Sequence, residues 1–227
     1  MRDWTKATDV DLSKPWFAKN AGWPDEVDPC ITIPQMTLGE MLRQTARTHP
    51  NHRAIWFLDT FMNYARLDEL VDRMATGLHG LGLRKGDVVA LILPNSPQFV
   101  VAYFACARLG CIVTGVNPTY KPSEVLHQLQ VTGARTLIVL DTLYDALIAP
   151  NLGKMAIDHV IVTNIADLMD LSMIKRALGR LLGKIPTSRV PAPAHSMTGL
   201  LRAPATPPRV AIGVHEPAVY LMTGGTT

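Results

Sequence analysis

The sequence predicts an α/β fold, in which a mainly parallel β-sheet is covered by helices on both faces. Short apolar runs of strand length alternate with longer segments whose apolar residues recur at helical spacing. The runs at 88–93, 111–116, 136–140 and 159–163 lack the regular polar alternation of a half-exposed strand. The helical segments between them suit right-handed crossovers, which join parallel neighbours in one sheet.

The first predicted helix begins at a capping box. In this motif the Thr37 hydroxyl and the Glu40 carboxylate each accept a hydrogen bond from a backbone N–H near the helix start. We expect the helix to run to about Thr48 and to bury Met41 and Leu42 on its inner face.

Two short strands, at 54–58 and 61–64, precede the clearest helix of the chain. That helix covers 67–81, where leucine, valine and methionine recur every three or four residues. Its acidic residues, Asp68 and Asp72 among them, are interpreted as a solvated face.

A further helix is predicted to begin at Ser96 and Pro97, since serine caps helix starts and proline suits the first helical position. The apolar stretch 99–116 approaches the length of a membrane span. Gly110 divides it, however, into a helix-like half and a β-branched half. We therefore interpret it as a buried helix followed by a buried strand. A shorter helix is predicted at 124–131.

Proline-rich segments separate the predicted parts of the chain. Residues 1–36 carry four prolines and predict an extended arm. Residues 37–185 form the α/β subdomain. Residues 186–208 contain six prolines and predict a crossing segment with little helix or sheet. Residues 209–227 begin a second subdomain, with a strand at 218–222.

Composition argues against several classes of protein. With 48% hydrophobic and 18% charged residues, the 227-residue chain is typical of globular proteins. Its net charge of +3 is weak evidence for a nucleic-acid partner. Three cysteines without paired spacing argue against a disulfide framework and indicate a reducing compartment, so a cytoplasmic location is expected. The seven histidines form no H-E-x-x-H pair, and no metal site is predicted.

The last five residues carry the clearest chemical signal; they are Thr223, Gly224, Gly225, Thr226 and Thr227. Glycines let the backbone approach an anion closely with its amides turned inward, and threonines add hydroxyl donors. Such a loop suits the oxygens of a polyphosphate, which need several convergent donors. An ordinary Gly/Thr turn after a strand is the alternative. The segment is not a P-loop of the G-x-x-x-x-G-K-[ST] type.

Several motifs, taken in order, resemble those of the adenylate-forming, or AMP-binding, superfamily. Residues 220–227, YLMTGGTT, resemble the opening of its phosphate-loop signature, which normally continues through a glycine, a proline and a lysine. Further resemblances lie upstream in the same order, at residues 81–90, 93–99, 115–120 and 133–135, with Pro15-Trp16 near the start. The chain thus resembles the N-terminal part of a long-chain fatty-acid–CoA ligase (acyl-CoA synthetase), truncated within the phosphate-loop motif. By that resemblance the α/β fold is an incomplete N-terminal domain of the adenylate-forming fold.

The chain departs from the superfamily's pattern in two places. Residues 63–67, NYARL, stand where Thr-Tyr-x-Glu-Leu is usual. Asn63 can still cap the helix, but Arg66 cannot serve as an acidic first-turn residue. Thr119 stands where long-chain members often have leucine, which bears on the substrate subgroup.

The resemblance implies a two-step reaction. A carboxylate reacts with ATP, accompanied by Mg²⁺, to give acyl-AMP and pyrophosphate, and coenzyme A then takes the acyl group. The resemblance also implies ligands for the β- and γ-phosphates, namely the hydroxyls of Thr223, Thr226 and Thr227 and the amides of Gly224 and Gly225. The signature lysine, the adenine and ribose contacts and the mobile C-terminal domain of such enzymes are not in the chain. We therefore assign it no catalytic residue and no metal ligand, and expect it to be inactive alone.

Two other functions stay open. One is a non-catalytic interaction or regulatory module that retains the scaffold. The other is an unrelated α/β nucleotide-binding enzyme. Two observations argue against such an enzyme. Residues 77–82 have the spacing G-x-x-G-x-G, whereas the dinucleotide-binding fingerprint is G-x-G-x-x-G. These residues also lie at the end of a predicted helix, whereas the fingerprint lies at the start of one. A nicotinamide or flavin site is therefore not expected.

The partners implied for the complete enzyme are fatty acid, ATP and coenzyme A, without nucleic acid. A basic amphipathic helix is predicted at 171–182. One interpretation is peripheral contact with a membrane through residues 173–184. The alternative is a helix packed on the core, with its lysines and arginines extended to solvent. A homodimer also stays open.

Overall fold

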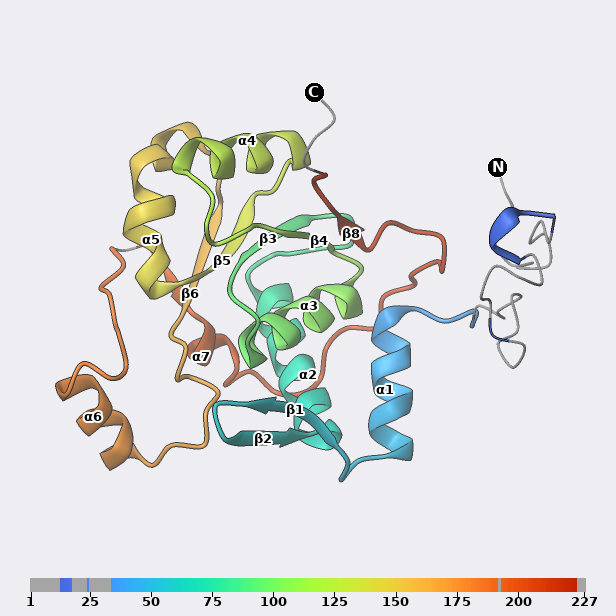
Figure 1. The fold of residues 1–227 in the computed structure, drawn as a ribbon, viewed down its shortest axis with the longest axis horizontal. Helices are drawn as coiled ribbons and strands as arrows, with labels where there is room; N and C mark the ends of the chain where they lie inside the picture. Colours follow the sequence, from blue (N-terminus) through green and yellow to red (C-terminus); the bar gives the residue numbers. More distant parts are fainter. Residues whose placement is uncertain (1–12, 18–23, 25–33, 192, 224–227) are drawn as a thin grey trace. The chain divides into compact units, whose positions relative to one another are not determined.

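The computed structural model describes residues 13–17, 24, 34–191 and 193–223 (Figure 1). The chain divides into two compact units, residues 1–36 and residues 37–227. In the first unit a short 3₁₀ helix, η1, covers Pro15–Phe17. Most of the arm predicted for this unit lies outside the described residues. The subdivision predicted within the second unit stays a prediction.

The second unit is built on a six-stranded sheet with the order β7-β6-β5-β3-β4-β8. Every pairing in this sheet is parallel, which confirms the predicted α/β class. The crossover that leaves β3 leads to β4, and the next crossover returns from β4 past β3 to β5. The strands are β3 (Val88–Ile92), β4 (Ile112–Gly115), β5 (Thr136–Leu140), β6 (His159–Thr163), β7 (His195–Ser196) and β8 (Val219–Tyr220).

Helices cover both faces of this sheet, and the side chains of each strand alternate between the faces. In β3, Val89 and Leu91 belong to the core cluster formed with α1, α2 and α3, whereas Ala90 and Ile92 belong to the cluster formed with α4 and α5. The helices of the first face are α1 (Leu38–Thr48), α2 (Tyr64–Gly80) and α3 (Pro97–Leu109). Those of the second face are α4 (Pro122–Thr132) and α5 (Asp141–Leu147), followed by the 3₁₀ helix η2 (Ala149–Lys154).

The apolar stretch 99–116 is divided as the sequence predicts. Ser96 Oγ accepts a hydrogen bond from Phe99 N at 3.5 Å at the start of α3. Gly110 ends the helix with a φ of 70°, and β4 follows two residues later. Among the described residues, no helix combines the length and the hydropathy needed to cross a bilayer.

A separate antiparallel hairpin precedes α2. It consists of β1 (Arg53–Phe57) and β2 (Thr60–Asn63). Leu58 and Asp59 between them have positive φ values of 45° and 60°, which is characteristic of type I′ hairpin turns. Both predicted strands are confirmed, each one residue earlier than expected. β2 ends early because the Asn63 side chain already caps α2.

The capping box of α1 is confirmed, but its predicted buried face is partly wrong. Glu40 N donates to Thr37 Oγ1 at 3.2 Å, and Thr37 N donates to Glu40 Oε2 at 2.8 Å. Met41, predicted to be buried, is 44% exposed. A Cβ at Gly39 would lie 3.3 Å from the Arg108 Cα, so α1 approaches α3 through this glycine. That close approach sets the rotation of α1 about its own axis and leaves the Met41 side chain exposed to solvent.

A cluster of ion pairs around the buried Arg108 joins three helices. Arg108 of α3 donates to the carboxylate of Asp68 at 2.5 Å and to that of Asp72. Arg43 of α1 also donates to Asp72, at 2.6 Å. The interpretation of Asp68 and Asp72 as a solvated face is therefore wrong. Both carboxylates lie on α2, where the neighbouring helices bring arginines to them.

Two α-helices, α5 and α6, lie between β5 and the proline-rich segment. The helix predicted at 171–182 is confirmed as α6, Met173–Leu181. α5 is not predicted from the sequence. It begins at Asp141, directly after β5, without a glycine or proline to mark the change from strand to helix.

The proline-rich segment contains more regular structure than the sequence predicts. β7 extends the sheet by pairing with β6. The short helix α7, Met197–Leu200, follows it, and Met197 is fully buried in the core of the first face. Residues 195–200 are therefore part of the sheet and its core.

A buried polar cluster attaches the start of that segment to the sheet. Asn164 Nδ2 donates to Asp141 Oδ2 at 2.9 Å and to Pro186 O at 2.8 Å. Ser188 N also donates to Asp141 Oδ2, at 3.3 Å. Asp141 and Asn164 are buried, and they follow β5 and β6 at the carboxyl edge of the sheet.

We predict that N164A lowers the free energy of unfolding by about 1–3 kcal/mol, because the buried Asp141 carboxylate and the Pro186 carbonyl lose the donor they share. Urea denaturation followed by circular dichroism measures the change. N95A is the matched control: Asn95 is exposed, and the same substitution there should change stability by less than about 0.5 kcal/mol. Equal effects at the two positions would contradict the prediction.

Candidate phosphate-binding site

The candidate site follows β8, the strand at one edge of the sheet. β8 runs parallel to β4, with Val219 opposite Val113. The chain therefore leaves β8 at the carboxyl edge of the sheet, where open parallel sheets bind their ligands. Thr223 is exposed three residues beyond β8. The other predicted phosphate ligands lie outside the described residues: Gly224, Gly225, Thr226 and Thr227.

A lysine in the turn before β3 holds the segment that leads into β8. Lys85 Nζ donates to Ala211 O and to Glu216 Oε1, both at 2.7 Å. The hydrogen bond from Lys85 and then that from the Gly213 backbone lower the pKa of Glu216. No local sequence pattern singles out Lys85 for this contact. Its partner Glu216 lies 131 residues further along the chain, beyond the reach of a local pattern.

The end of α3 packs against the same segment. A Cβ at Gly110 would lie 3.0 Å from Lys85 Cγ and 3.1 Å from Ile212 Cγ1. Glycine is therefore needed here both for its left-handed backbone and for the space that Ile212 occupies. Beyond this contact, Val113 N donates to Ala218 O at 3.0 Å and sets the start of β8.

The corner after β4 lies beside the candidate site, because β4 is the neighbour of β8. Asn117 Oδ1 accepts hydrogen bonds from Thr119 N at 2.9 Å and from Thr119 Oγ1 at 2.8 Å. Gln128 Nε2, which is buried, donates to Thr114 Oγ1 at 2.8 Å and to Gly115 O at 2.9 Å. Thr119 stands where the family resemblance expects leucine. Its hydroxyl supplies a second donor to the Asn117 turn.

The described part of the site offers the hydroxyl of Thr223 in an exposed position. Thr223 has no side-chain hydrogen bond to another described residue, so its hydroxyl is available to an anion. Leu221 is 76% exposed, and Tyr220 and Met222 are exposed too. No three His, Cys, Asp or Glu side chains of the described ranges lie close enough together to hold a metal ion. We therefore assign no ligand for Mg²⁺.

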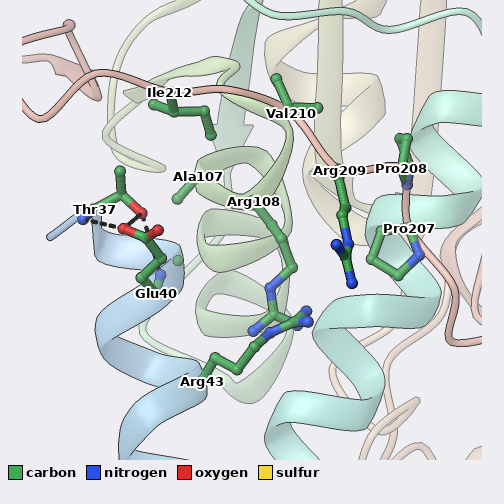
Figure 2. A pocket seen from close by; sticks show the side chains of 11 residues that line it. Thr37, Glu40, Arg43, Ala107, Arg108, Pro207, Pro208, Arg209, Val210 and Ile212 are labelled. Atoms are coloured by element: carbon green, nitrogen blue, oxygen red, sulfur yellow. Dashed lines mark hydrogen bonds between the residues drawn. The ribbon is translucent and has the colours of Figure 1, made fainter.

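A hollow of about 310 Å³ lies elsewhere, between α1, α3 and residues 207–212 (Figure 2). Arg43, Arg108 and Arg209 line it. Arg43 and Arg108 both bind Asp72, which balances part of their charge. Thr223 does not line this hollow, and we assign it no ligand.

Comparison with known proteins relates the chain to one enzyme family. The model of the AMP-binding enzyme family matches residues 42–227. A long-chain-fatty-acid–CoA ligase of Bacillus subtilis (strain 168) is 31% identical, over 96% of this chain and 39% of that protein. One of Escherichia coli O157:H7 is 34% identical, over 79% of this chain and 31% of that protein.

A solved structure shows the same fold. The long-chain-fatty-acid-CoA ligase of Archaeoglobus fulgidus matches with a TM-score of 0.67 at 22% identity, over 87% of this chain and 36% of that one. The chain therefore spans about a third of the length of the curated relatives named above.

We predict that G110A destabilises the chain more than G133A. Both glycines have φ near 70°, so alanine at either position costs about 1–2 kcal/mol in backbone strain. A Cβ at Gly133 would meet nothing within 4 Å, whereas one at Gly110 would press on Lys85 and Ile212. We expect a further loss of about 1–3 kcal/mol for G110A.

Urea denaturation of both variants measures the difference in stability. Hydrogen exchange should also be faster at the Val113 amide in G110A alone, because that amide bonds to Ala218 O. Equal costs and equal exchange in the two variants would show that Gly110 does not support the approach to β8.

Proposed function

Because the chain belongs to the AMP-binding enzyme family, we propose that it is the N-terminal segment of an ATP-dependent long-chain fatty-acid–CoA ligase. In the proposed reaction an oxygen of the fatty carboxylate attacks the α-phosphorus of ATP. The bond from that phosphorus to the pyrophosphate oxygen breaks, and acyl-AMP forms. The thiol of coenzyme A then takes the acyl group and releases AMP.

The observation that supports this proposal is the position of β8, the strand that leads to Thr223. The strand is parallel to β4, and Lys85 and Gly110 contact the segment that leads into it. The chain leaves β8 at the carboxyl edge of the sheet, which is the edge where open parallel sheets bind their ligands. The relatives that share the sequence pattern are named as long-chain-fatty-acid–CoA ligases.

Within the proposal, the residues from Thr223 onward hold the β- and γ-phosphates of ATP. Thr223, Thr226 and Thr227 donate hydroxyl hydrogen bonds, and Gly224 and Gly225 present backbone amides. The exposed Thr223 hydroxyl fits this role, since it has no other side-chain partner among the described residues. Mg²⁺ would neutralise part of the phosphate charge, with ligands that we do not place in this chain.

We further propose that the chain is inactive by itself and contains no catalytic residue. Catalysis of this kind depends on positioning and on many donors directed at the phosphates. The proposed ligands from Thr223 onward are hydroxyls and backbone amides, with no cationic side chain among them. A ligand with four negative charges would lose more hydration than this site can replace.

A non-catalytic interaction module is the second candidate function. It is favoured by the apolar side chains at β8, where Val219, Leu221 and Met222 are exposed. A sheet edge of this kind can pair with another chain, a homodimer included.

The remaining partners and the location belong to the ligase proposal. The complete enzyme would take fatty acid and coenzyme A besides ATP, and it would act in the cytoplasm. Contact with a membrane surface through residues 173–184 would suit an enzyme whose acyl substrate dissolves in lipid.

We expect isothermal titration of the 227-residue chain with Mg-ATP to give no saturable heat below about millimolar nucleotide, since the donors are too few. Circular dichroism and cooperative unfolding of the same sample would show that the chain is folded. A micromolar dissociation constant would contradict the inactivity proposal. Its loss in the G224A/G225A variant would then assign the binding to this loop.

We also expect the isolated chain to self-associate through β8, and L221K to reduce this association, because a charge on an exposed edge opposes strand pairing. Sedimentation velocity over a range of concentrations measures it. L152K is the control, since Leu152 is also exposed but lies in η2. A monomeric parent chain, or equal effects of the two substitutions, would contradict this expectation.

A further inference from the structure

Helix α6 turns its apolar side away from the rest of the chain. Ile174 is 79% exposed and Leu181 is 83% exposed, and Leu178 and Leu182 are exposed as well. At 3.6 residues per turn these four positions fall within an arc of about 100°. They therefore form one continuous apolar stripe, which we call the α6 stripe. In Figure 1 the helix lies at the margin of the second unit, between two extended segments.

The opposite side of α6 makes the contacts with the chain. Arg176 Nη2 donates to Met169 O at 3.3 Å, and Arg176 Nη1 lies 3.8 Å from the Asp167 carboxylate. Gly179 lies against Ile185, so closely that a Cβ there would stand 2.7 Å from Ile185 Cδ1. A surface helix normally packs its apolar side inward and exposes its charges. In α6 an arginine faces inward and the leucines face outward.

The α6 stripe lies in the most basic part of the chain. Residues 171–215 contain seven lysines and arginines and no aspartate or glutamate, although the whole chain has a net charge of only +3. Lys175, Arg180 and Lys184 lie on or beside α6 and are exposed. None of the three makes a side-chain hydrogen bond or ion pair with another described residue. An apolar stripe flanked by free cations is typical of helices that lie in a membrane interface.

We propose that α6 attaches this chain to anionic lipid. Ile174, Leu178, Leu181 and Leu182 enter the boundary between head groups and acyl chains, and the neighbouring lysines and arginine bind lipid phosphates. With nine residues and a rise of about 1.5 Å per residue, α6 is too short to span a bilayer and lies in its plane. This inference deepens the peripheral contact proposed above, on which it rests, but it does not require the chain to bind ATP.

Charge favours lipid over the other occupants of such a surface. A second copy of the chain would bring an identical set of cations to the same apolar contact, and like charges repel there. A nucleic acid would match the charge but would leave the four apolar side chains in water. An anionic bilayer can bind both the cations and the apolar side chains of α6, because its phosphates lie directly above the hydrocarbon.

Vesicle flotation tests the proposal, because floating separates lipid-bound protein from aggregates that would sediment. The 227-residue chain, without nucleotide, is mixed with neutral phosphatidylcholine vesicles or with vesicles that also contain phosphatidylglycerol. We expect flotation with the anionic vesicles only, weakening as salt is added. A micromolar dissociation constant for Mg-ATP, which would contradict the inactivity proposal, would leave this result unchanged, so the two proposals can fail separately.

Two double variants separate the charges from the stripe. K175Q/R180Q should weaken partition roughly thirtyfold, since each basic residue near an anionic surface contributes about fivefold. I174S/L181S should abolish flotation. The matched controls are R47Q/K154Q and V131S/L152S, which alter exposed residues outside α6 and should float like the parent. All four variants should unfold like the parent, because the altered side chains are exposed.

Several results would overturn the proposal. These are an absence of flotation on anionic vesicles, equal flotation on neutral ones, and equal effects of the α6 variants and their controls. Sedimentation velocity could give one more result against the proposal. Self-association that I174S/L181S abolishes, without lipid binding by the parent, would assign the α6 stripe to a second copy of the chain.

Discussion

Strand β3 is buried on both faces and paired on both edges, and the second unit of the chain is arranged around it. Its residues from Val89 to Ile92 are fully buried. Parallel neighbours can be joined only by crossovers, so the connections themselves supply the helices that cover the sheet. Crossovers leave β3 toward β4 on one side and return to β5 on the other. One strand thus accounts for the two layers of helices.

The same parallel order explains where the polar contacts gather. The strands all end at one edge, so the side chains that follow β5 and β6 meet there, and Asp141 and Asn164 together hold the segment that leads to β7. The approach to β8 is held from the start of β3, where Lys85 binds Glu216. The strand that leads to Thr223 is therefore positioned by residues distant in sequence, because β4 pairs with it and Lys85 and Gly110 contact the segment before it.

Helix α6 is an exception to the packing that governs the other helices. Its inward contacts are an arginine bonded to Asp167 and to a backbone carbonyl, and a glycine that admits Ile185. Neither contact buries the α6 stripe. The fold is complete without these leucines, which separates their role from that of the sheet core and leaves them available to lipid.

Local patterns were enough to predict the α/β class, the central strands, most helix starts and the resemblance to adenylate-forming ligases. Each of these depends on residues close together in the chain: Ser96 before α3, the apolar run of β3, or the YLMTGGTT segment. Long-range packing decided the rest. It paired Asp68 and Asp72 with Arg108, exposed Met41, placed β7 and α7 in a proline-rich segment and turned the apolar side of α6 outward. Amphipathic spacing identifies two sides of a helix, but only the partners supplied by distant segments determine which side is covered.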